Sequence, residues 1–71
     1  MRIVRVLERI RAGKDRAWVR GELIATGVPE ADADTWCDRW EGEARRIGLH
    51  ADTDDFWTIG SVWIKERQRR R

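Results

Sequence analysis

The chain has 71 residues and a formal net charge of +2, with one cysteine and one histidine. These counts exclude an internal disulfide and the usual zinc ligand sets. No stretch approaches the roughly 20 apolar residues of a membrane span, and the first residues lack the apolar stretch of a signal peptide. The sequence therefore predicts one small domain over residues 1–71, cytoplasmic, with no cofactor and no membrane partner.

Five tryptophans are the main large side chains of this domain. A chain of this size buries only about 60% of the surface of its unfolded state, so its core is thin. Each indole can bury roughly 150–250 Å², which makes the tryptophans the natural source of a core. We predict a core built on Trp18, Trp36, Trp40, Trp57 and Trp63.

Charge is segregated along the chain more strongly than the net value indicates. Residues 1–29 carry seven basic and three acidic groups, giving +4. Residues 30–55 carry three basic and nine acidic groups, giving −6. Residues 56–71 carry five basic groups and one acidic group, giving +4. Two basic segments therefore flank an acidic one.

Helical spacing organises the first part of the chain. A first helix is predicted over residues 1–13 and ends at Gly13. Its apolar stripe consists of Ile3, Val6, Leu7 and Ile10, and the opposite, basic stripe consists of Arg2, Arg5 and Arg9. Asp15 can cap a second helix that runs to about Thr26. Gly27 ends this helix, and Pro29 suits the first turn of the next.

The third predicted helix has the clearest apolar stripe, with spacings of 3, 4, 7, 11 and 14 from its first member. Its members are Ala33, Trp36, Cys37, Trp40, Ala44 and Ile47. Acidic residues occupy the first turns, and Arg45 and Arg46 occupy the last, as the helix dipole favours. Gly48 followed by Leu49 is typical of a Schellman stop.

The last segment fits two structures. As a hairpin, a glycine-serine type II′ turn joins two short strands within residues 55–66. As a helix, the segment takes Thr53 as its cap, and its apolar line consists of Phe56, Ile59 and Trp63. Gly60 costs about 1 kcal/mol in a helix interior, but it also lets another helix approach closely. Propensity alone slightly favours the hairpin.

The stretch RWEGEARRIGL (39–49), followed by DFWTIGSVWIKERQRRR (55–71), carries a further pattern. It resembles small uncharacterised open reading frames of actinobacteria and their phages, in which W-E-x-E-A-x-x-x-G-L precedes F-W-x-x-G-x-x-W-I. The variable positions there hold residues that favour a helix, so the resemblance implies a helical last segment. We predict a small all-α domain of four helices with a Trp-rich core. The alternative is a winged helix-turn-helix, with residues 55–66 as a β-hairpin.

Candidate catalytic motifs are weak. The stretch HADTDD (50–55) gathers a histidine and three carboxylates, but it reads more simply as a polar loop and a helix cap. Cys37 lies on an apolar stripe, which is typical of a small buried hydrophobe rather than of a nucleophile. The sequence has no glycine-rich phosphate loop and no serine nucleophile motif. We predict no enzyme and no small-molecule substrate.

Basic residues indicate binding to nucleic acid. DNA carries one negative charge per about 1.7 Å of axis, so the acidic third helix is a poor recognition helix. Phosphate contacts are expected from the two basic segments, at Arg2, Arg5, Arg9, Lys14, Arg16, Arg20, Arg67, Arg69, Arg70 and Arg71. The predicted function is that of a small phage or actinobacterial nucleic-acid-binding protein.

A protein-interaction module is the alternative function. Segregated charge equally suits a phage protein that binds a host protein, because complementary patches steer association. It also suits a homo-oligomer, with the basic end of one copy against the acidic middle of another. The acidic middle segment distinguishes the two predicted functions, because a protein dedicated to DNA binding does not need such a segment.

Overall fold

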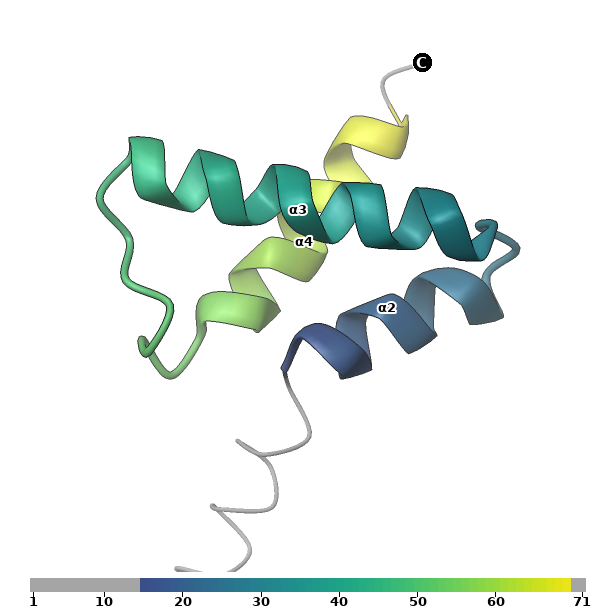
Figure 1. Ribbon diagram of the computed structural model, residues 1–71, viewed down its shortest axis with the longest axis horizontal. Helices are drawn as coiled ribbons and strands as arrows, with labels where there is room; N and C mark the ends of the chain where they lie inside the picture. Colours follow the sequence, from purple (N-terminus) through teal and green to yellow (C-terminus); the bar gives the residue numbers. More distant parts are fainter. Residues whose placement is uncertain (1–14, 70–71) are drawn as a thin grey trace, which may run out of the picture.

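Three helices form the part of the chain that the computed structural model describes, residues 15–69 (Figure 1). They are α2 (Arg16–Ala25), α3 (Glu30–Arg46) and α4 (Phe56–Arg69). Residues 15–69 contain no strand, which confirms the all-α class. The predicted first helix over residues 1–13 lies outside the described residues, so the count of four helices stays a prediction.

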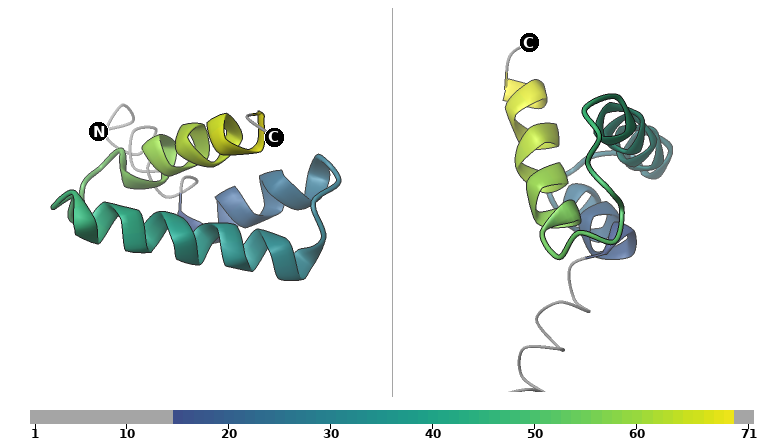
Figure 2. Two further views of the ribbon diagram at one scale, coloured as in Figure 1. Left: turned by 90° about the horizontal axis from the view of Figure 1, so that it is seen from above. Right: turned by 90° about the vertical axis from the view of Figure 1, so that its left-hand side faces the viewer.

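Local signals set both ends of α2 as predicted. The side chain of Asp15 accepts a hydrogen bond of 2.9 Å from the backbone N–H of Trp18. At the other end Gly27 has a φ of 100°, and the N–H of Val28 donates to the carbonyl of Leu23 at 3.0 Å. This is a Schellman turn. It reverses the chain, so that α3 runs back beside α2, and α4 packs across both (Figure 2).

The predicted Schellman stop of α3 is also confirmed. Gly48 has a φ of 78°, and the N–H of Leu49 donates to the carbonyl of Ala44 at 2.8 Å. The start of α3 is shifted by one residue from the expectation, because Pro29 is its cap and Glu30 its first helical residue.

Residues 56–69 form one helix, so the hairpin alternative for residues 55–66 is wrong. Gly60 accounts for this outcome against propensity. It is buried, and a Cβ at this position would lie 2.8 Å from Cε2 of Trp40, which real side chains do not tolerate. The glycine therefore lets the indole of α3 rest on the backbone of α4. Close packing between helices outweighs the roughly 1 kcal/mol that glycine costs in a helix.

The start of α4 corrects a second expectation. Thr53 is not its cap, because two turn residues separate it from Phe56, where the helix begins. The backbone carbonyl of Thr53 instead accepts a hydrogen bond of 3.0 Å from the N–H of Phe56.

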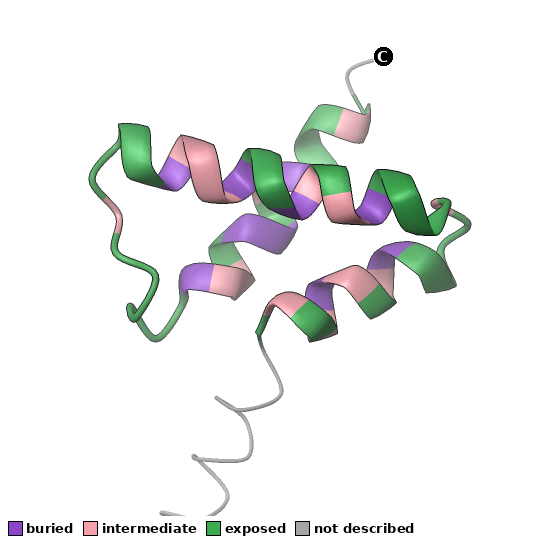
Figure 3. Ribbon diagram, viewed as in Figure 1, coloured by how far each residue is buried: buried purple, intermediate pink, exposed green. Residues whose placement is uncertain are grey.

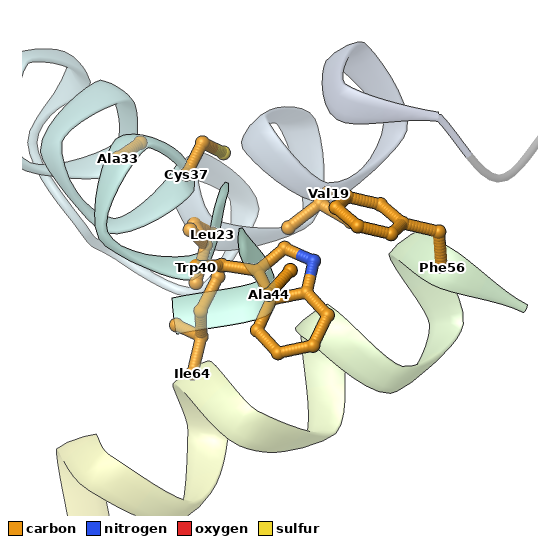
Figure 4. Close-up of a cluster of buried hydrophobic side chains, with 8 residues drawn as sticks. All are labelled: Val19, Leu23, Ala33, Cys37, Trp40, Ala44, Phe56 and Ile64. Carbon is orange, nitrogen blue, oxygen red and sulfur yellow. The ribbon is translucent and has the colours of Figure 1, made fainter. Parts of the chain in front are cut away.

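Buried residues lie on the sides of the helices that face one another (Figure 3). Trp40 is 1% exposed, and its ring centroid lies 5.3 Å from that of Phe56 and 5.7 Å from that of Trp63. Figure 4 shows its indole over α4, between Phe56 and Ile64. The other core residues are Val19, Leu23, Ala33, Cys37 and Ala44.

The tryptophans differ in burial, although their cluster is consistent with the predicted Trp-rich core. Trp40 alone among the five is fully buried, and the others are partly buried and pack against the core cluster, namely Trp18, Trp36, Trp57 and Trp63. Two residues expected on apolar stripes lie largely outside, since Ile47 is 54% exposed and Ile59 is 42% exposed.

Candidate nucleic-acid interface

The described residues contain four of the ten predicted phosphate contacts. Arg16 and Arg20 lie on α2, and Arg67 and Arg69 lie on α4. The other six fall outside residues 15–69 and remain predictions, namely Arg2, Arg5, Arg9, Lys14, Arg70 and Arg71. The two helices give their arginines very different surroundings.

The arginines of α2 are paired with carboxylates of α3. Nη1 of Arg16 lies 2.6 Å from Oε1 of Glu41, and Nε of Arg20 lies 2.7 Å from Oδ1 of Asp34. The further carboxylates within 3 Å of these guanidinium groups belong to Asp38 and Glu30. These four acidic residues follow one flank of α3, the flank that faces α2.

This pairing stabilises the charged form of both guanidinium groups. Burial acts against the charge of Arg16, but its hydrogen bond with Asp38 and the charge of Glu41 outweigh it and raise the pKa. Hydrogen bonds with Asp34 and Glu30 raise the pKa of Arg20. Both arginines therefore neutralise part of the acidic flank of α3, and their role as phosphate contacts stays a prediction.

On the opposite flank of α3, one arginine of α3 and one of α4 lie on indole rings. Cζ of Arg39 is 4.6 Å from the centroid of the Trp36 ring, and Cζ of Arg67 on α4 is 4.0 Å from that of Trp63. The two indoles meet edge to face, with centroids 6.5 Å apart. Arg39, Trp36, Trp63 and Arg67 thus form a continuous row across α3 and α4, stabilised by cation–π attraction.

An open groove of about 410 Å³ lies beside this row. Its lining residues are Arg39, Gly42, Glu43, Arg46, Trp63 and Arg67. Glu43 accepts hydrogen bonds of 2.9 and 2.6 Å from Nε and Nη2 of Arg46, and this pairing lowers the pKa of its carboxyl. Three arginines and one glutamate leave the groove with a formal charge of +2. We call it the basic groove.

Sequence reasoning missed two of these arginines. Arg39 and Arg46 belong to the segment with a summed charge of −6, and the sum hid them. The available signal was their spacing of seven residues, which places them on one helix face two turns apart. Sequence reasoning also grouped Arg67 with Arg69, but residues two apart on a helix diverge by about 200°. Arg67 lines the basic groove, and Arg69 does not.

Other chemistry finds little support in the described part of the chain. Residues 15–69 contain no group of three or more His, Cys, Asp or Glu side chains that could hold a metal ion. Cys37 is buried, and burial raises the pKa of its thiol. Among the described helices, none combines the length and the hydropathy needed to cross a membrane. Comparison of the chain with family models, with curated proteins and with solved structures gave no match.

Proposed function

We propose that the protein binds the phosphate backbone of nucleic acid through the basic groove. Arg39, Arg46 and Arg67 surround the groove, and guanidinium groups are well suited to phosphate because they donate paired hydrogen bonds in one plane. The observation that carries the proposal is the row of arginines and indoles. Two of the guanidinium groups are held over rings at 4.6 and 4.0 Å, so less side-chain freedom is lost when phosphate binds.

The arrangement of α3 removes the main objection to such a function. Its acidic flank faces α2, where Arg16 and Arg20 neutralise it, while the basic groove lies on the other flank. Phosphate at the groove therefore need not approach the carboxylates of the acidic flank. Contacts to phosphate carry no sequence information, so binding is expected to be independent of sequence and strongly dependent on salt.

A direct test is fluorescence anisotropy on a labelled random duplex at about 50 mM and about 200 mM salt. If about four to six phosphates are neutralised, with the predicted terminal arginines included, log affinity falls against log salt with a slope of about −4 to −5. The double variant Arg39→Ala and Arg67→Ala should flatten this slope by up to about two.

Two control variants make the test specific to the groove. Arg45 is exposed on the same helix but does not line the groove, so Arg45→Ala should leave the slope nearly unchanged. Glu43→Gln removes the negative charge of the groove and should strengthen binding. Absence of binding at the lower salt by a folded chain, or equal effects of Arg45→Ala and Arg39→Ala, contradicts the proposal.

The alternative, a protein-interaction module, is favoured by a different surface. Val62 and Ile59 on α4 are 60% and 42% exposed, and they lie on the same side of that helix. This surface and the basic groove occupy neighbouring faces of α4 and meet at Trp63, which lines both.

A further inference from the structure

The outer face of α4 is apolar and exposed, although the opposite face of the helix carries part of the core. An open hollow of about 550 Å³ lies on it, lined by Asp55, Thr58, Ile59, Val62 and Trp63. Within residues 15–69, neither α2 nor α3 contributes to this lining. Its two exposed apolar side chains, Ile59 and Val62, are 42% and 60% exposed.

The outer face has a period of seven residues. Asp55, Val62 and Arg69 follow one another at that spacing, so they lie nearly on one line along the helix. Asp55 belongs to this line because its carbonyl accepts a hydrogen bond of 2.8 Å from the N–H of Ile59, as in a helical turn. The line is acidic at one end, apolar in the middle and basic at the other end. Such a line complements a reversed copy of itself.

We propose that the outer face of α4 binds a second copy of the chain, with the two α4 helices antiparallel and a two-fold axis at Val62. Asp55 and Arg69 are both seven residues from Val62. Asp55 of each copy therefore meets Arg69 of the other, and the two copies of Val62 meet at the axis. An isologous contact of this kind forms every pair twice.

Residues beside the central line agree with the antiparallel orientation. On one side Ile59 comes next to Glu66 of the other copy, and on the other side Thr58 comes next to Lys65. None of these aligned positions brings like charges together. A parallel pair would instead set Asp55 against Asp55 and Arg69 against Arg69, which like-charge repulsion disfavours. Charge complementarity therefore favours a second copy of α4 as the partner of this face, in the antiparallel direction.

The two-fold axis also decides where the basic grooves lie. It runs perpendicular to both α4 helices, so each flank of α4 stays on its own side of the pair. The flank with Trp63 and Arg67, which faces α3, is then on the same side in both copies. The pair presents two basic grooves on one surface, a consequence that rests on the proposed function, whereas the pairing itself does not.

The size of the contact limits its strength. A helix of 14 residues is about 21 Å long, and one pair of such helices covers less than the roughly 1,200–2,000 Å² of a stable interface. Association should therefore depend on concentration. Sedimentation equilibrium of the full chain between about 20 µM and about 1 mM should show the average mass rising from 8.4 kDa toward twice that value.

Cysteine cross-linking tests the geometry of the pair. Under mild oxidation Val62→Cys should form a disulfide-linked dimer, because the two positions face each other at the axis. Thr58→Cys should not, because the two copies of this position are separated by about 12 Å along the helices. The parent chain is the control, since its Cys37 is buried. Equal cross-linking of both variants indicates a parallel pair and overturns the proposal.

A charge exchange tests the complementarity. Asp55→Arg sets like charges together twice and should weaken the dimer by roughly tenfold, and adding Arg69→Asp should restore it. All of these measurements are made without nucleic acid, so their outcome does not depend on the basic groove. The proposal is overturned if the chain stays monomeric at the highest concentration and Val62→Cys does not cross-link. This holds whichever other segment or protein covers the face.

Discussion

The two flanks of α3 use charge in opposite ways. On the flank toward α2, carboxylates and guanidinium groups pair directly, with contacts such as the 2.6 Å between Arg16 and Glu41. On the flank toward α4, Arg39 and Arg67 lie on indole rings and keep their outer sides open to the basic groove. The flank toward α2 is therefore covered by ion pairs, whereas the flank toward α4 combines one ion pair, between Glu43 and Arg46, with two arginines that lie on indoles.

The two flanks also differ in whether they contribute mainly to the stability of the domain or mainly to the orientation of its helices. Ion pairs between partly exposed side chains contribute little, typically about 0.2–1 kcal/mol each. Burial of one large aromatic side chain contributes several times more. We therefore expect the contact between α3 and α4 to hold the domain together, and the ion pairs to set how α2 lies against α3. Three substitutions test this division.

The largest effect is expected for Trp40→Ala. Trp40 is 1% exposed and packs against Phe56 and Trp63, so its removal should lower the free energy of unfolding by about 3–5 kcal/mol. Its indole N–H has no hydrogen-bond partner among the described residues, so the loss measures packing. Thermal unfolding followed by circular dichroism gives the value. If the variant melts near the parent temperature, the stability of the domain does not depend on the packing of Trp40.

The second effect is expected for Gly60→Ala. The added Cβ overlaps the ring of Trp40, so the two helices must separate, and the variant should lose about 1–3 kcal/mol. Gly21→Ala on α2 is the matched control, because a Cβ there meets nothing within 4 Å. The control should gain up to about 1 kcal/mol from helix propensity. Equal effects in urea denaturation would show that α3 and α4 are not in close contact at Gly60.

The smallest effect is expected for Arg16→Met, which removes the charge and keeps much of the stem. The loss should be about 1 kcal/mol or less and should shrink as salt is added, because the pairs are partly exposed and screened. The loss in Trp40→Ala should not respond in this way. Arg45→Met serves as the control for removal of an exposed charge. If Arg16→Met lowers the free energy of unfolding more than Gly60→Ala does, the ion pairs on the flank toward α2 contribute more stability than the contact between α3 and α4.

Sequence reasoning was most successful at three helix ends that depend on neighbouring residues, although the equally local cap at Thr53 was wrong. The caps at Asp15, Gly27 and Gly48 are local, because each involves hydrogen bonds within a few residues. The helical state of residues 56–69 was harder, because it depends on Gly60 meeting Trp40, twenty residues earlier. Local propensity takes no account of a contact between residues so far apart in the sequence. The helix was favoured instead by the resemblance of this segment to other sequences.

The candidate site was predicted less well, for a related reason. Charge was summed over segments, whereas the structure divides it between faces. Arg16 and Arg20 were counted as available, but their partners lie ten to twenty-five residues away on another helix. Arg39 and Arg46 were hidden within an acidic segment, although they share one face of α3. Only the packing of the helices shows which charges meet carboxylates and which face outward.

The buried thiol of Cys37 provides a kinetic measure of the core. The side chain is 0% exposed and belongs to the only cysteine of the chain. A thiol reagent therefore modifies the protein only during moments when the helices around Cys37 open. When closing is fast, the rate of modification equals the open fraction multiplied by the rate for a free thiol. The rate at which the native chain loses its thiol thus reports the fraction of molecules in which the helices around Cys37 are open.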